Sequence, residues 1–174
     1  LLGVPLGNLT VQSFANSETE VKLGESVRDK HTFVIASPSD PVNDTLVALS
    51  LVCQALKLNE AKKVTAIIPY FAYSRQDRQL DGVRSPISAR FVTDTLEAMG
   101  VERIVTVDVH AKQIAGFFRG GAFENLSGLS HMVPKVLAGE HGDLLVVSPD
   151  EGGSKRATAF ARLIESDGSR TAPV

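Results

Sequence analysis

Hydrophobic residues follow two different spacings that succeed one another along most of the chain. Four segments are nearly continuous in Val, Ile, Leu and Phe, as strands are when both faces of their sheet are covered. They predict parallel strands over residues 32–37, 64–71, 103–110 and 143–150. Apolar residues at helical spacing predict helices over residues 43–57, 85–100 and 154–166. A shorter alternation of apolar and polar residues predicts a hairpin or edge ribbon over residues 11–15 and 20–23.

The predicted helices carry further signals of their length and orientation. The second begins with Ser85 as N-cap and Pro86 at the first helical position, and it stops at Gly100. One stripe of the first helix holds four apolar residues: Leu46, Leu49, Cys53 and Leu56. Strand and helix in alternation are typical of the α/β class, so we expect a doubly wound parallel sheet in a three-layer αβα architecture.

The two ends of the sequence both resemble interrupted elements. The first eight residues, "LLGVPLGN", look like the tail of an earlier helix. The last residues, "IESDGSRTAPV", stop where a further strand is expected after a helix. We therefore expect the chain to be a piece of a longer α/β protein.

Composition narrows the class of protein without identifying it. A chain of 174 residues with 43% hydrophobic residues can build one core or slightly more. Its net charge of −2 gives no overall attraction to nucleic acid or membrane, so polyanion binding would need a local patch. The single cysteine, Cys53, excludes a disulfide framework and favours a reducing compartment. With no apolar run of membrane-spanning length and no basic signal-peptide start, we expect a cytoplasmic protein.

The residues that follow the predicted strands hold the candidate chemistry, because ligands of open α/β sheets bind beyond the carboxyl ends of the strands. Residues 69–86, "PYFAYSRQDRQLDGVRSP", leave the second strand and crowd six charged or amide side chains together: Arg75, Gln76, Asp77, Arg78, Asp81 and Arg84. Arginine forks match phosphate oxygens. By charge alone a solvated loop is the more common explanation. The position at a strand exit favours a binding site.

Three other places allow both a functional and a structural explanation. Asp108 and His110 lie two residues apart on a predicted strand and so share a face, where they could ligate a metal, form an acid/base pair, or merely cap the sheet. Asp150 precedes a Gly-Gly pair and a helix start, which fits a phosphate site or a tight turn. On the ribbon, one face holds Phe14, Asn16 and Glu18, a set that could stack on a base and bond its edge or belong to an ordinary ribbon.

Four stretches together resemble the ribose-phosphate diphosphokinases, also called PRPP synthetases. They are "FANSETEVKLGESVR", "IPYFAYSRQDRQ", "SPISARFVTDTLEAMGVERIVTVDVHAKQIAGFF" and "VVSPDEGGSKRA". The order and spacing agree over residues 9–164. The resemblance implies a phosphoribosyltransferase-like fold, with an ATP-binding domain over residues 1–145 and the start of a second, truncated domain over residues 146–174.

The resemblance also implies a transferase reaction of nucleotide biosynthesis. Such enzymes move the diphosphoryl group of ATP to the C1 hydroxyl of ribose 5-phosphate, giving PRPP and AMP, and they use Mg²⁺. Their subunits form homo-oligomers, commonly hexamers built from dimers, with no nucleic acid or membrane partner. By position, the residues along ATP would be Arg75, Gln76 and Asp77. The adenine contacts, donated by a neighbouring subunit, would be Phe14, Asn16 and Glu18.

Further roles carry over by position in the same way. His110 and Arg75 would be the catalytic residues. The metal ligands would be Asp108, His110 and Asp150, and Asp150 would also hold the ribose hydroxyls, directly or through metal. A regulatory anion would be bound, as in some members, by Ser26 and Arg28.

Two departures from the family pattern limit this transfer. The family usually has an acidic residue directly after "GFF", where this chain has Arg119. The acidic Gly/Thr-rich loop that grips ribose 5-phosphate and the mobile Lys/Arg segment of the family's second half do not occur in this sequence. We therefore expect this piece alone to be inactive or nearly so. Two alternatives to an enzyme of this family are a non-catalytic regulatory paralogue and a different phosphoribosyl-handling α/β protein.

Overall fold

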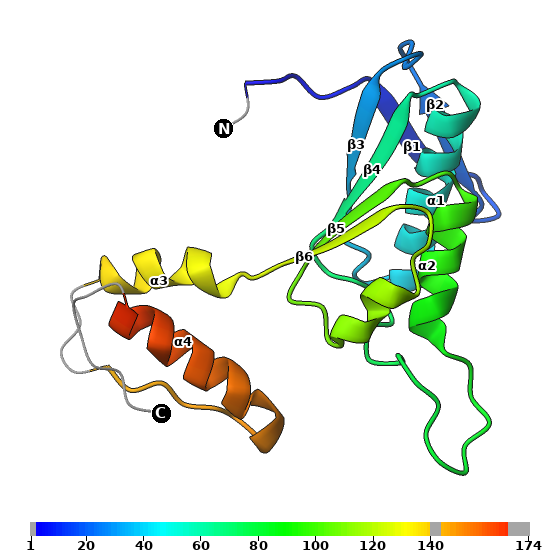
Figure 1. The fold of residues 1–174 in the computed structure, drawn as a ribbon. Helices are drawn as coiled ribbons and strands as arrows, with labels where there is room; N and C mark the ends of the chain where they lie inside the picture. Colours follow the sequence, from blue (N-terminus) through cyan, green and yellow to red (C-terminus); the bar gives the residue numbers. More distant parts are fainter. Residues whose placement is uncertain (1–2, 140–143, 167–174) are drawn as a thin grey trace. The chain divides into compact units, whose positions relative to one another are not determined.

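A parallel sheet of four strands lies at the centre of the first part of the chain (Figure 1). Its order is β3 (His31–Ile35), β4 (Lys63–Ile68), β5 (Arg103–Val107) and β6 (Ala122–Leu126), with every neighbouring pair parallel. A separate antiparallel ribbon pairs β1 (Leu9–Ser13) with β2 (Thr19–Leu23). The expected α/β class, the parallel sheet and the hairpin are confirmed.

The computed structural model describes residues 3–139 and 144–166, which fall into two units. The first unit is Leu1–Leu126 and the second is Ser127–Val174. The boundary that we expect between residues 145 and 146 concerns the domains of a longer protein and stays a prediction. Among the described residues, no helix is long and apolar enough to cross a membrane.

One face of the sheet is covered by α1 (Val42–Leu58) and α2 (Ser88–Ala98), which lie together on one side in Figure 1. Val64, Ala66 and Ile68 alternate along β4 onto this face and are fully buried. The predicted apolar stripe of α1 packs into the same core. On the opposite face of β3, Phe33 and Ile35 remain 65% and 67% exposed. Within the first unit, the described helices therefore form one layer against the sheet.

The end of α2 shows how the sequence sets an element boundary. Gly100 has φ +85°, the left-handed conformation that favours glycine after a helix. Its N–H donates to the Glu97 carbonyl at 3.0 Å, and the Val101 N–H donates to the Leu96 carbonyl at 3.0 Å. These two bonds satisfy carbonyls that a helix end leaves open, and Val101 is buried beside them. The predicted stop at Gly100 is confirmed.

The predicted start of the same helix is wrong by two residues. The helix begins at Ser88 with Ile87 as N-cap, so Ser85 and Pro86 lie in the preceding loop. The Ser85 carbonyl accepts a hydrogen bond from Gln79 Nε2 at 2.6 Å, which holds that residue in the loop. The other two predicted helices are confirmed as α1 and as α4 (Ser154–Ser166).

The predicted fourth strand over residues 143–150 is wrong. Asp143 lies outside the described residues, and residues 144–150 form no strand, with Leu145 and Val147 largely exposed. The fourth strand is instead β6, which holds Glu124 and Asn125 and, among the described strands, pairs with β5 alone. An apolar run does not become a strand without a partner for its backbone groups. A polar edge strand gives too weak an alternation to be recognised from sequence.

In the part of the second unit that the structure describes, two α-helices pack together. They are α3 (Leu129–Leu137) and α4, with the short turns of η2 (Glu151–Gly153) leading into α4. Val133, Ala161 and Ile164 form its buried cluster. The helix α3 was not predicted, because it is short and contains Pro134, a residue that usually ends a helix.

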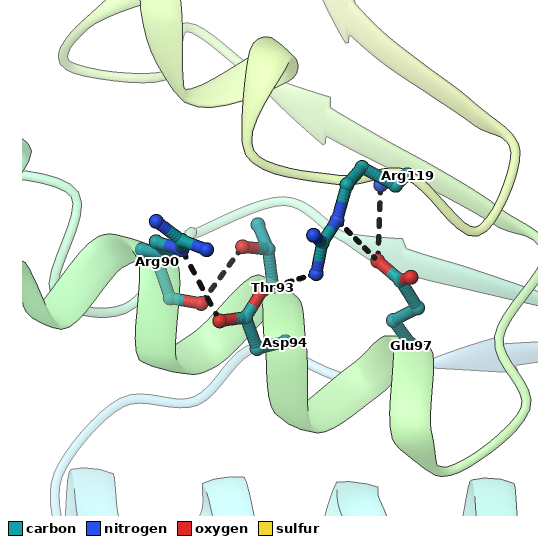
Figure 2. Close-up of polar contacts among 5 residues, drawn as sticks. All are labelled: Arg90, Thr93, Asp94, Glu97 and Arg119. Atoms are coloured by element: carbon teal, nitrogen blue, oxygen red, sulfur yellow. Dashed lines mark hydrogen bonds and ion pairs between the residues drawn. The ribbon is translucent and has the colours of Figure 1, made fainter.

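Arg119, the residue that departs from the family pattern, connects the turn before β6 to α2 (Figure 2). Its backbone N–H donates to Glu97 Oε2 at 3.0 Å. Its guanidinium lies 3.6 Å from Asp94 Oδ1 through Nη2 and 4.0 Å from Glu97 Oε2 through Nε. The arginine therefore balances two carboxylates of one helix, and an acidic residue at this position would add a third negative charge.

We expect Arg119→Asp to lower the thermal unfolding temperature by about 2–4 °C, the effect of about 1 kcal/mol in a domain of this size. Arg119→Lys, which keeps the positive charge, serves as the control and should change the temperature by less than half of that. Scanning calorimetry at low and high salt measures both, and salt should reduce the difference. Equal stability of the two variants at low salt would contradict the role in charge balance.

Cys53 is fully buried in α1, and burial raises the pKa of its thiol from the ordinary 9.0 to about 12. The folded protein should therefore resist thiol reagents at about pH 8 and react only after denaturation.

Since the Cys53 thiol keeps its proton to higher pH in the folded state than in the unfolded state, its contribution to stability is complete below pH 9 and is lost as the pH rises toward 12. Urea titrations of the protein and of Cys53→Ala at several alkaline pH values measure this slope by difference. Rapid labelling of the folded protein would refute the burial.

Candidate functional site

The loop after β4 is tied by side-chain hydrogen bonds to three other elements. Tyr73 Oη donates to Asn43 Oδ1 in the first turn of α1, which follows β3. Ser88 Oγ, at the start of α2, donates to Gln76 Oε1 at 2.6 Å. Gln113 Nε2, in η1 (Lys112–Gly116) after β5, donates to Asp77 Oδ2. The segments leaving β3, β4 and β5 therefore meet at one edge of the sheet.

The ends of β5 and β6 are joined at the same edge. The Asp108 N–H donates to the Leu126 carbonyl at 2.9 Å, and the Val109 N–H donates to Asn125 Oδ1 at 2.9 Å. Asp108 has φ +46°, in the left-handed region that only a few residue types tolerate, and this turns the chain out of the strand. All four strand ends are thus connected directly or through one intermediate segment.

This turn corrects the expected placement of two site residues. The strand predicted over residues 103–110 ends at Val107, so Asp108 and His110 lie in the turn and not on a strand face. Both are exposed at the strand end. Exposure leaves them accessible to a ligand, and the turn, not strand alternation, sets where their side chains lie.

An open groove of about 600 Å³ lies between the exits of β3 and β4. This volume is within the range of about 300–1,000 Å³ found for small-molecule sites. Its lining residues come from the segment before and at the start of α1 and from the loop after β4: Asp40, Pro41, Val42, Asn43, Asp44, Tyr70, Tyr73, Ser74, Arg75 and Gln76. Arg75 is exposed in this groove. A guanidinium placed there presents forked donors of the kind that bind phosphate oxygens.

The three residues predicted to lie along ATP differ in their surroundings. Arg75 is exposed, the Gln76 side chain accepts from Ser88, and Asp77 is only 9% exposed with its carboxylate bonded to Gln113. Arg75 is therefore the one of the three whose side chain reaches the groove without a hydrogen bond to the described part of the chain.

The predicted adenine-binding residues lie at the tip of the β1–β2 ribbon. The Phe14 N–H donates to the Glu18 carbonyl at 2.8 Å, and the Asn16 Oδ1 accepts from the Glu18 N–H at 3.2 Å. Phe14 is 50% exposed, and Asn16 and Glu18 are exposed too. They belong to the turn and not to a strand face, so turn geometry groups them. Their contact with adenine stays a prediction.

The predicted regulatory residues are adjacent to the ribbon in sequence. Ser26 is exposed and precedes the buried Val27. Arg28 Nε lies 2.7 Å from Glu60 Oε2 in an exposed ion pair. A bound anion would have to share this guanidinium with Glu60, and the regulatory role stays a prediction.

Asp150 belongs to the second unit, where its side chain closes a turn. Its Oδ1 accepts from the Gly153 N–H at 2.7 Å, and its carbonyl accepts from Ser148 Oγ at 2.6 Å. A Cβ at position 153 would lie 2.5 Å from Ser148 Oγ, so a larger residue there would displace the Ser148 side chain. The tight-turn explanation of the Gly-Gly pair accounts for these contacts.

The predicted metal ligands belong to two different units of the chain. In the ranges that the structure describes, no group of three or more His, Cys, Asp or Glu side chains could hold a metal ion. Asp108 and His110 lie in the first unit and Asp150 in the second. Two exposed donors still suit Mg²⁺, which commonly takes one or two protein ligands and completes its shell with water and substrate phosphates.

The sequence did not point to the residues that hold the loop in place. Asn43, Tyr73, Ser88 and Gln113 were not singled out, although each lies within a few residues of a predicted strand exit. A polar side chain at such a place is too common to be a signal by itself. Tyr73, with φ +60°, carries a backbone conformation that its residue type does not suggest.

Comparisons with known proteins agree on one family. A model described as the N-terminal domain of ribose phosphate pyrophosphokinase matches residues 1–100. The ribose-phosphate pyrophosphokinase of Marinomonas sp. (strain MWYL1) is 44% identical over 164 residues, which are 94% of this chain and 52% of the relative. That of Burkholderia pseudomallei (strain K96243) is 44% identical over 167 residues, 96% of this chain and 52% of the relative.

A solved structure gives the same result in three dimensions. The crystal structure of phosphoribosylpyrophosphate synthetase from Mycobacterium smegmatis matches with a TM-score of 0.86 and 38% sequence identity, covering 98% of this chain and 56% of that chain. The chain spans about half the length of the curated relatives it matches. The family model, the relatives and the fold together show that this chain belongs to the ribose phosphate pyrophosphokinase family.

Proposed function

We propose that the protein containing this chain is a ribose-phosphate pyrophosphokinase. It transfers the diphosphoryl group of ATP to the C1 hydroxyl of ribose 5-phosphate and releases PRPP and AMP. The observation that carries the proposal is the meeting of the β3, β4 and β5 exits around the exposed Arg75, in a chain whose relatives bear this enzyme's name. Those names do not favour the regulatory paralogue.

The reaction requires control of negative charge more than covalent chemistry from the protein. The C1 hydroxyl oxygen forms a bond to the β-phosphorus of ATP and loses its proton to water, the bond from that phosphorus to the α,β-bridging oxygen breaks, and AMP leaves with the electron pair. Charge accumulates on the phosphoryl oxygens during transfer, so prearranged donors lower the barrier. Arg75 supplies charged donors from the groove, and His110 supplies an imidazole N–H at the neighbouring exit.

Mg²⁺ bound with ATP would neutralise part of the triphosphate charge. Asp108 and His110 would hold it, with water and phosphate oxygens completing its coordination. Asp150 would contact the ribose hydroxyls. The adenine would rest on the ribbon tip of a neighbouring copy, on Phe14, Asn16 and Glu18, which makes a homo-oligomer, a hexamer built from dimers, part of the proposal.

The remaining parts of the proposal concern the binding of a regulatory anion, the ribose 5-phosphate site and the cellular location of the protein. Ser26 and Arg28 would bind a regulatory anion. The relatives are about twice as long as this chain, so the groups that grip ribose 5-phosphate would lie in sequence beyond it. A cytoplasmic location would suit the buried free thiol of Cys53, which needs no oxidising compartment.

Substitution of Arg75 tests the proposal directly in the full-length protein. Arg75→Ala should lower the rate of AMP release from ATP and ribose 5-phosphate by about 10²–10³-fold, the usual cost of one lost donor to a developing anion. Its unfolding temperature should stay within about 2 °C, because exposed side chains contribute little to stability. Arg90→Ala, which removes an exposed arginine of α2 paired with Asp94, is the matched control and should retain activity. An Arg75→Ala enzyme as fast as the parent would refute the role assigned to Arg75. A parent protein that forms AMP only after a second, active protein is added would indicate the regulatory paralogue.

A further inference from the structure

Asp77 lies in a charged loop but is itself almost enclosed. It is 9% exposed, whereas Gln76 and Arg78 on either side are exposed. An ionised carboxylate withdrawn from water is costly unless hydrogen bonds replace those it loses. Gln113 Nε2 donates such a bond to Asp77 Oδ2. The carboxylate thus faces the protein and has little surface left for a ligand.

Gln113 is well placed to act as a fixed donor. It belongs to η1, and Ile114, which follows Gln113 in this element, is fully buried in the main core. The Ile114 N–H donates to the Ala111 carbonyl at 3.1 Å, and the Phe117 N–H donates to the Ile114 carbonyl at 2.9 Å. Core packing therefore holds the backbone of η1, and a side chain rooted there can define the position of a loop from another strand.

Arg75 lies between two such fixed points. On its N-terminal side, Tyr73 is bonded to Asn43 of α1. On its C-terminal side, Asp77 is bonded to Gln113 of η1. Between them the Gln76 N–H donates to the Tyr73 carbonyl at 2.9 Å, and the Gln76 carbonyl accepts from the Ala89 N–H at 3.1 Å. The backbone that carries Arg75 is therefore held on both sides, and Arg75 lines the groove.

We propose that Gln113 is a positioning residue that fixes Asp77 and, through it, Arg75, and that Asp77 anchors the loop instead of contacting ATP or its metal. This differs from the role that family resemblance implies for Asp77. The catalytic consequence rests on the proposed function, because it requires that Arg75 binds the transferred phosphates. Prearrangement of that donor saves reorganisation during the reaction and should appear mainly in the turnover number.

The decisive variant is Asp77→Asn in the full-length enzyme. An asparagine can still accept the bond from Gln113 through its Oδ1, but it has no negative charge. If Asp77 is an anchor, Asp77→Asn should keep kcat within about threefold of the parent, while Asp77→Ala should lose about 10–100-fold in kcat with a smaller change in KM for ATP. If Asp77 is a ligand of metal or ATP, Asp77→Asn should lose as much as Asp77→Ala, and the proposal is overturned.

Gln113→Ala tests the other partner of the bond. It should lower kcat to the same extent as Asp77→Ala, and the double variant should be no slower than the slower single variant, since both remove one interaction. Gln54→Ala is the matched control, because Gln54 is an exposed glutamine of α1 outside this loop, and it should be unchanged. Additive losses in the double variant would overturn the coupling.

Hydrogen exchange separates this proposal from the proposed function. Peptides covering residues 73–80 should take up deuterium faster in Gln113→Ala than in the parent, with α1 unchanged. If the parent forms no AMP, the proposed function fails, and the exchange result alone still decides whether Gln113 holds the loop. Unchanged exchange over residues 73–80 in a folded Gln113→Ala protein would overturn the anchor.

Discussion

The pairing of β4 with β3 on one side and with β5 on the other is the constraint on which the rest of the site depends. A central parallel strand that is covered by helices must start and end at fixed places, because any slip would move its apolar residues off the core face. Val64, Ala66 and Ile68 are held in this way. The loop that carries Arg75 begins just beyond Ile68, so the pairing of β4 in the sheet also holds the first residues of this loop in place.

Side-chain hydrogen bonds then extend this rigidity beyond the strand. Loops on protein surfaces are usually the mobile parts, and function often depends on a scaffold that positions them. Here the scaffold reaches the loop through Asn43, Ser88 and Gln113, one from each neighbouring element. The result is a charged loop in which Tyr73, Gln76 and Asp77 are hydrogen-bonded to neighbouring elements, while Arg75 stays exposed in the groove.

Arg119 shows the same principle at a site away from the groove. The resemblance leads us to expect an acid at this position, but the chain has a base there, and its neighbours on α2 are the carboxylates of Asp94 and Glu97 (Figure 2). The substitution is accommodated because the local charges suit it. The residue acts in this structure as a link between the turn before β6 and α2, which accounts for it without a ligand.

The sequence by itself determined the class of the fold, three of the four sheet strands, three helices and the location of charge at strand exits. Local spacing is enough for these, because burial on one side of a helix or on both faces of a strand leaves a pattern in neighbouring residues. Only the tertiary structure decided that β6 and not residues 144–150 completes the sheet, that Asp108 turns out of its strand, and that Asp77 is enclosed while Arg75 is exposed. Each of these depends on a partner far away in the chain, such as Gln113 for Asp77, and the choice of a distant partner leaves no trace in the local order of residues.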